Sequence, residues 1–162
     1  MRYLFTLLFA FILFGFSIES NKSGIEIYTV KEGFKKSLKD CEYCFDEKTV
    51  ELSDKPILDE NDIENFNWKN QKISLNISGK EKLKKLKIEL SGLPVVMVLN
   101  KKRIYGFWFW NLFSSFSCDR VYTYPDKDFK IKFGLPEKYA FGKDPRFDKL
   151  LEKYVVEKYK QN

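Results

Sequence analysis

The strictest constraint on the fold is a continuous apolar run at residues 95–99, Val-Val-Met-Val-Leu. Successive side chains of a strand point to opposite faces, so a run without polar residues needs both faces covered. It predicts a buried central strand. Residues 100–103 predict a turn and residues 103–110 predict the next strand, so the two strands should form a hairpin.

Other segments alternate apolar and polar residues, the period of a strand with one buried face. We expect strands at residues 25–30, 49–52, 72–77, 121–124 and 129–133, with a short helical turn at residues 59–63.

A capping box predicts where the first helix begins. Ser78 and Glu81 have the spacing at which each side chain reaches the other residue's backbone amide. Leu83, Leu86 and Leu90 then recur at helical spacing and predict one core-facing stripe.

Asp144 followed by Pro145 predicts the start of a second helix, with a cap and then a proline at the first helical position. Its apolar stripe comprises Phe147, Leu150, Leu151, Tyr154 and Val155. Together the elements predict an α+β fold, a mainly antiparallel sheet with two amphipathic helices packed on it, in one domain over residues 21–162.

The N-terminal segment predicts export. One basic residue, Arg2, precedes an apolar run over residues 3–16, and small and polar residues follow. The run is short for a bilayer core of about 30 Å, so residues 1–20 are interpreted as a secretory signal peptide. Cleavage after Ser17 and cleavage after Ser20 both remain open, and an uncleaved membrane anchor is the alternative. The destination is periplasmic or extracellular.

The formal net charge is +6, carried mostly by lysine. Export argues against a nucleic-acid partner, and the basic surface leaves a weak contact with anionic membrane surface as the electrostatic alternative. Lysines 80, 82, 84, 85 and 87 surround the first expected helix opposite its leucines and are interpreted as a solvated face.

Four segments together resemble a known domain: residues 55–63, the strand at 72–77, Gly79 with its helix, and residues 93–104. Over about residues 55–105 the chain resembles the periplasmic P1 head subdomain of the protein-export subunit SecD. That family has Asp-Gly at the hairpin turn, where this chain has Asn-Lys-Lys. The resemblance implies a stand-alone exported head-like domain. Because the SecD head is thought to contact translocating polypeptide, it also favours protein binding.

Three cysteines offer a second line of chemistry. Cys41 and Cys44 form a C-x-x-C motif, and Cys118 is remote in sequence. An oxidising compartment favours a structural disulfide, either between Cys41 and Cys44 or between one of them and Cys118. The alternatives are a redox-active pair and a metal site. Neighbouring Asp40 and Glu42 disfavour a low thiol pKa, and the absence of histidine leaves a metal short of ligands.

The most aromatic stretch of the chain follows the hairpin turn. Its alternation places Phe107 and Phe109 on one face of a strand, and Trp108 and Trp110 on the other. Core packing on both faces is one interpretation. The other is an exposed aromatic row that binds a partner, with Tyr105 and these four residues as the site.

The sequence therefore predicts a non-enzymatic protein- or peptide-binding module of the cell envelope, acting through the aromatic strand and its flanking loops. A thiol-redox or metal-binding protein that uses Cys41 and Cys44 is the alternative. No cofactor and no metal are expected. Serine hydrolase chemistry is disfavoured because no histidine is present to activate a hydroxyl.

Overall fold

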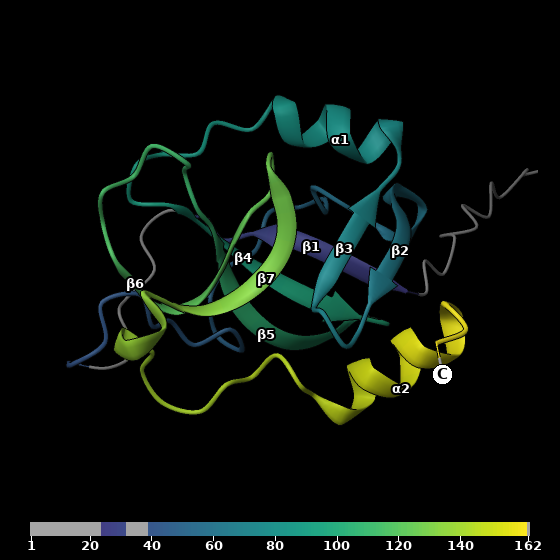
Figure 1. Ribbon diagram of the computed structural model, residues 1–162. Coiled ribbons are helices and arrows are strands. Elements are labelled where there is room, and N and C mark those ends of the chain that lie inside the picture. Colours follow the sequence, from purple (N-terminus) through teal and green to yellow (C-terminus); the bar gives the residue numbers. More distant parts are fainter. Residues whose placement is uncertain (1–23, 32–38, 162) are drawn as a thin grey trace, which may run out of the picture.

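The computed structural model describes residues 24–31 and 39–161 (Figure 1). Within that part of the chain, seven strands form one sheet in the order β1-β4-β5-β6-β7-β3-β2. The strands are β1 (Ile25–Thr29), β2 (Ile63–Asn67), β3 (Lys72–Leu75), β4 (Leu93–Leu99), β5 (Lys102–Phe109), β6 (Cys118–Tyr124) and β7 (Asp128–Leu135). The helices are α1 (Ile77–Lys84) and α2 (Lys149–Lys158), with 3-10 turns η1 (Glu60–Asp62) and η2 (Glu137–Tyr139). The predicted α+β class is confirmed.

The predicted hairpin is formed by β4 and β5, which pair antiparallel from Leu93 with Phe109 to Leu99 with Lys102. Asn100 and Lys101 both have positive φ, as the tight turns that join such strands require. The sheet is mixed, because β5 and β6 pair in parallel. The remaining strand pairs are antiparallel.

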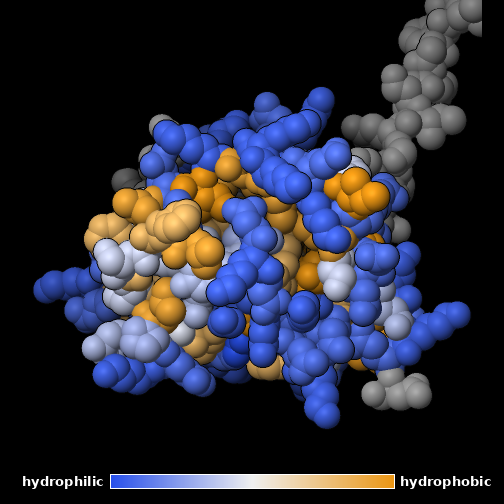
Figure 2. Space-filling model, turned by 45° about the horizontal axis from the view of Figure 1, so that its top comes forward, coloured by the Kyte–Doolittle hydropathy of each residue, from blue (hydrophilic) through white to orange (hydrophobic). Residues whose placement is uncertain are grey.

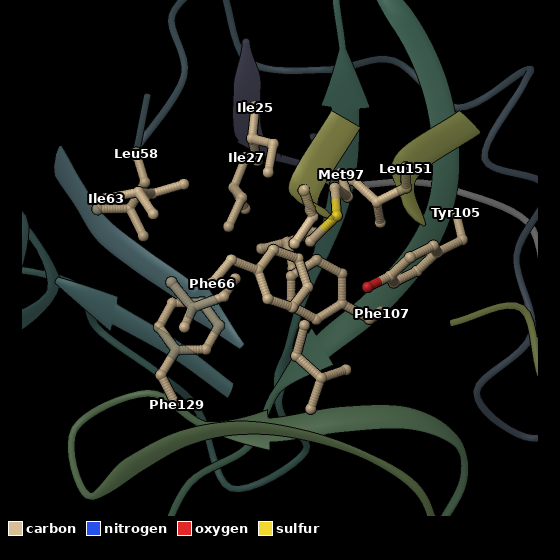
Figure 3. Close-up of a cluster of buried hydrophobic side chains, with 14 of the residues drawn as sticks. Ile25, Ile27, Leu58, Ile63, Phe66, Met97, Tyr105, Phe107, Phe129 and Leu151 are labelled. Atoms are coloured by element: carbon tan, nitrogen blue, oxygen red, sulfur yellow. The ribbon is translucent and has the colours of Figure 1, made fainter. Parts of the chain in front are cut away.

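The sheet curves until its two outer strands approach each other. Leu58, just before η1 and β2, bridges to Ile27 of β1. This curvature encloses a core to which all seven strands contribute, and Figure 3 shows its side chains converging from opposite strands. Figure 1 shows the strands lying between α1 and α2, and each helix adds to the core: Leu83 from α1, and Leu151 and Val155 from α2.

The first helix begins and ends at other residues than expected. Its N-cap is Asn76, whose side chain accepts from the amide of Gly79, while the Ser78 hydroxyl lies 3.3 Å from Asp62 Oδ1. The helix ends at Lys84, where the amides of Lys85 and Leu86 donate three residues back, to the carbonyls of Lys82 and Leu83. In the segment that follows, the Ile88 carbonyl accepts from the Asn111 side chain at 2.7 Å. Leu83 and Leu86 pack against the core as predicted, although Leu86 lies beyond the helix, whereas Leu90 is 51% exposed and is not part of the stripe.

The second helix begins later than the Asp144–Pro145 signal predicts. The Asp144 carboxylate is occupied by Arg146, whose NH2 lies 2.7 Å from Oδ2. Asp148 is the N-cap instead and accepts from the amides of Leu150 and Leu151. Phe147 precedes the helix and stays largely exposed, so it is not part of the core stripe.

The C-terminal residues hold the outer edge of β2. Gln161 donates its carboxamide to the Phe66 carbonyl, and its Oε1 accepts from the Trp68 amide at 2.8 Å. Tyr159 donates its hydroxyl to Glu60 Oε1 at 2.9 Å. These bonds tie the end of the chain to the segment around η1 and β2.

Candidate functional site

The aromatic side chains of β5, together with Trp110 directly after it, divide between the two faces of the strand as predicted. Tyr105, Phe107 and Phe109 point into the main core, where Figure 3 shows Tyr105 and Phe107 among the aliphatic side chains. Trp108 and Trp110 belong to a second cluster on the other face, with Tyr43, Cys118 and Tyr122. None of the five aromatic residues is more than 6% exposed. The expectation of an exposed aromatic row on this strand is therefore wrong, and core packing on both faces is the observed arrangement.

The segment that contains the C-x-x-C motif covers the tryptophan face. The Tyr43 ring packs edge-on against Trp108 and Trp110, at centroid distances of 5.1 and 4.9 Å. The Trp108 indole donates from Nε1 to the Tyr43 carbonyl at 2.9 Å. Farther along, the Phe45 ring lies over Gly106, where an added Cβ would collide with it. The covering segment thus satisfies a polar indole as well as burying two rings.

A disulfide joins Cys41 and Cys44, which resolves the open pairing alternatives. The Asp119 carboxylate receives two amides from inside the loop, Glu42 N at 2.7 Å and Tyr43 N at 3.1 Å. Neither amide has another acceptor among the described residues of the loop, and hydrogen bonds to a charged carboxylate are strong. Asp119 therefore holds the disulfide loop against β6.

The surroundings of this disulfide do not resemble those of a reactive dithiol. Cys41 and Cys44 are buried, and the motif lies in a bend without regular secondary structure rather than at the start of a helix that would favour a thiolate. Burial also raises the pKa of the free Cys118 thiol to about 12, which keeps it protonated at neutral pH. Thiol-redox chemistry remains a prediction that no feature of the described site favours.

Two kinds of site are not found among residues 24–31 and 39–161. No group of three or more cysteine, aspartate or glutamate residues there could hold a metal ion. No helix of this part of the chain is long and apolar enough to cross a bilayer. The apolar run at residues 3–16, with Ser17 and Ser20, lies outside the described residues.

The loop after β5 carries the exposed apolar side chains that the strand itself lacks. We call residues 111–117 the β5–β6 loop. Phe113 is 87% exposed, and Leu112 and Phe116 are 52% and 53% exposed. In Figure 2 hydrophobic residues gather on the left of the view, the side on which Figure 1 shows this loop. Exposed aromatic and aliphatic side chains gathered in one loop are typical of interaction surfaces.

The β5–β6 loop is held in place at both ends and from within. It runs from the buried Trp110 to the buried Cys118. Asn111 donates from Nδ2 to the Ile88 carbonyl at 2.7 Å and accepts at Oδ1 from the Phe113 amide at 2.9 Å. The conformation of the loop is therefore fixed by hydrogen bonds.

Sequence reasoning named flanking loops as part of the surface but singled out none of these side chains. The available signal was three large apolar residues among serine and asparagine, in a segment with neither strand nor helix periodicity.

No family model matches the chain, and neither a curated protein nor a solved structure matches it. The resemblance to the SecD head therefore stays a prediction.

Proposed function

We propose that this protein is an exported, non-enzymatic module of the cell envelope that binds a protein or peptide through its β5–β6 loop. The observation that carries the proposal is the exposure of Phe113 in a loop that hydrogen bonds hold in place. The proposal keeps the binding role expected from the sequence and moves the contact surface from β5 to the loop that follows it.

Burial of these side chains supplies the driving force for binding. Each fully buried phenylalanine or leucine side chain contributes about 1.5–3 kcal/mol. A loop that is already ordered loses little conformational entropy on binding, so more of that free energy appears as affinity. The partner surface is accordingly apolar, with a pocket for the Phe113 ring.

Two arguments support export, one from the sequence and one from the structure. The signal peptide is a sequence prediction, and the Cys41–Cys44 disulfide is compatible with an oxidising compartment. The SecD-like head remains a proposed relationship and adds only the expectation that the partner is a polypeptide.

A site-specific cross-link tests the function. A photoreactive phenylalanine analogue is placed at position 113 in the full chain, and the protein is irradiated in the envelope of the producing cell. Tyr139, an aromatic residue that is 55% exposed on η2, is the matched control position. We expect one discrete protein adduct from position 113, reduced by Leu112→Ser with Phe116→Ser, and no such adduct from position 139.

Two results would overturn the proposal. One is equal cross-linking from both positions, because the loop would then have no preference. The other is an adduct with lipid, accompanied by Phe113-dependent binding to anionic vesicles, which would make the loop a membrane contact.

A further inference from the structure

A groove opens where β3 and β7 separate. The register of these two strands contains one residue pair, Lys72 with Lys130, next to a bond from the Ile131 amide to the Gln71 carbonyl. Beyond that pair the space between the strands is a cavity of about 610 Å³. Its lining comes from β2, β3, α1, the turn before β7 and the first residues of β7.

The floor of the groove is apolar and its α1 wall is cationic. The floor is formed by Ile73, Leu75, Leu83 and Phe129. Lys80 and Lys84 stand one helical turn apart on the wall, and Lys127 approaches from the turn before β7. Near the middle of Figure 2 hydrophilic side chains stand on both sides of a hydrophobic strip.

Charges in the groove are unevenly distributed. Lys72 Nζ lies 3.2 Å from Asp128 Oδ1, so this pair is neutralised within the wall opposite α1. The other lining carboxylates, Glu64 and Asp126, belong to β2 and to the turn before β7. Among the described residues, Lys80, Lys84 and Lys127 form no ion pair within 4.0 Å. The α1 wall therefore presents two lysines, Lys80 and Lys84, that no carboxylate of the described residues approaches within 4.0 Å.

We propose that this groove binds an extended peptide segment in which acidic and apolar residues alternate. In an extended chain, successive side chains point to opposite sides. One row then packs on the apolar floor while the other row meets Lys80 and Lys84. The diverging edges of β3 and β7 offer the main-chain groups with which an added strand pairs. A cavity of this volume holds a few residues of such a segment.

This groove is separate from the β5–β6 loop, so the inference stands whether or not the loop binds. Peptide binding to the groove is measured in vitro with a known probe, whereas the loop is tested by cross-linking in cells. A negative result in the peptide-binding assay therefore leaves the cross-linking test of the loop unaffected, and a negative cross-linking result leaves the peptide-binding assay unaffected.

The test uses two synthetic peptides of equal composition, one with alternating glutamate and valine and one with the same residues in two blocks. Each carries a fluorophore, and binding is followed by fluorescence anisotropy. We expect the alternating peptide to bind and Lys80→Glu with Lys84→Glu to weaken its affinity roughly tenfold or more. Lys149→Glu with Lys153→Glu, the same charge change at the same spacing on α2, should change the affinity less than about twofold.

A second variant fills the groove without changing its charge. Ser74 is half-buried in the lining, and Ser74→Trp should abolish binding while the circular dichroism spectrum stays that of the wild type. Equal weakening by the two lysine double variants would overturn the inference. Equal binding of the alternating and block peptides would do the same, because attraction would then depend on charge alone.

Discussion

The indole nitrogen of Trp108 and the main-chain carbonyl of Tyr43 are joined by a hydrogen bond of 2.9 Å, although 65 residues separate them in sequence. That bond makes the tryptophan face of β5 an interior surface. The segment that contains the Cys41–Cys44 disulfide packs on this face, so the stability of the strand and the position of that segment depend on each other.

Removing either tryptophan should therefore damage the fold. We expect Trp108→Ala and Trp110→Ala each to lower the free energy of unfolding by about 3–5 kcal/mol, because both rings are buried against Tyr43. Phe113→Ala, at an exposed position, should stay within about 0.5 kcal/mol of the wild type. Urea unfolding followed by circular dichroism measures all three. Full stability of Trp108→Ala together with lost partner capture would return the contact surface to the strand.

Asp119 should control the order of the disulfide loop. Asp119→Ala leaves the amides of Glu42 and Tyr43 without their acceptor, and we expect a loss of about 1–2 kcal/mol. Hydrogen exchange at these two amides should accelerate in the variant, and Asp119→Asn, which keeps one acceptor oxygen, should fall between the variant and the wild type. Unchanged exchange in Asp119→Ala would show that other contacts hold the loop.

Cys118 should make the fold sensitive to alkali. Burial raises the pKa of this thiol from 9.0 to about 12. Between these values the unfolded chain has lost the proton and the folded chain keeps it, so rising pH favours unfolding. Below pH 9 the shift has no effect on stability. Above pH 9, and up to the pKa of the thiol in the folded protein, the free energy of unfolding falls by about 1.4 kcal/mol for each pH unit.

The contribution of Cys118 is isolated by comparison with Cys118→Ala. Tyr43 and Tyr122, with pKa values raised to about 12, act in the same direction and remain in the variant. We expect the urea midpoint to fall between about pH 8 and about pH 11 in both proteins, and to fall by more in the wild type than in Cys118→Ala. Parallel losses in both proteins would contradict the assignment.

Gly106 and Phe45 should be coupled. A methyl group at position 106 would collide with the Phe45 ring, and we expect Gly106→Ala to cost about 1–3 kcal/mol. Phe45→Leu shortens the side chain above that position, so the double variant should lose less than the sum of the two single variants. Thermal or urea unfolding of the four proteins measures the coupling energy. Simple additivity would mean that Phe45 moves aside without cost.

Periodicity in the sequence predicted much of the sheet, because the apolar run at residues 95–99 and the alternation around it describe strands that the core demands. β2 was missed because its sequence, Ile-Glu-Asn-Phe-Asn, has two apolar residues three apart, so no period-2 pattern is visible. The predicted strand at residues 49–52 is an isolated bridge between Leu52 and Val30.

Helix boundaries and the exposed surface depended on contacts that no local pattern contains. Asn111 holds the segment that follows the first helix by a bond to the Ile88 carbonyl, 23 residues away, and Arg146 occupies the carboxylate that was expected to cap the second helix. In the same way, Tyr43 covers an aromatic strand 65 residues later in the chain. Side-chain alternation therefore predicted which face of β5 each ring occupies, but not that the disulfide segment covers the tryptophan face.

The hold of Gln161 on β2 has a consequence for the behaviour of the protein at high concentration. An outer strand with unpaired amides and carbonyls is a template on which a second molecule can add, and growth of that kind leads to fibrils. Here one carboxamide engages the Phe66 carbonyl and the Trp68 amide as a neighbouring strand would, while Leu58 and Leu52 occupy the opposite margin beside β1. Gln161 thus occupies main-chain groups at the outer edge of β2 with which a strand of a second molecule would otherwise pair.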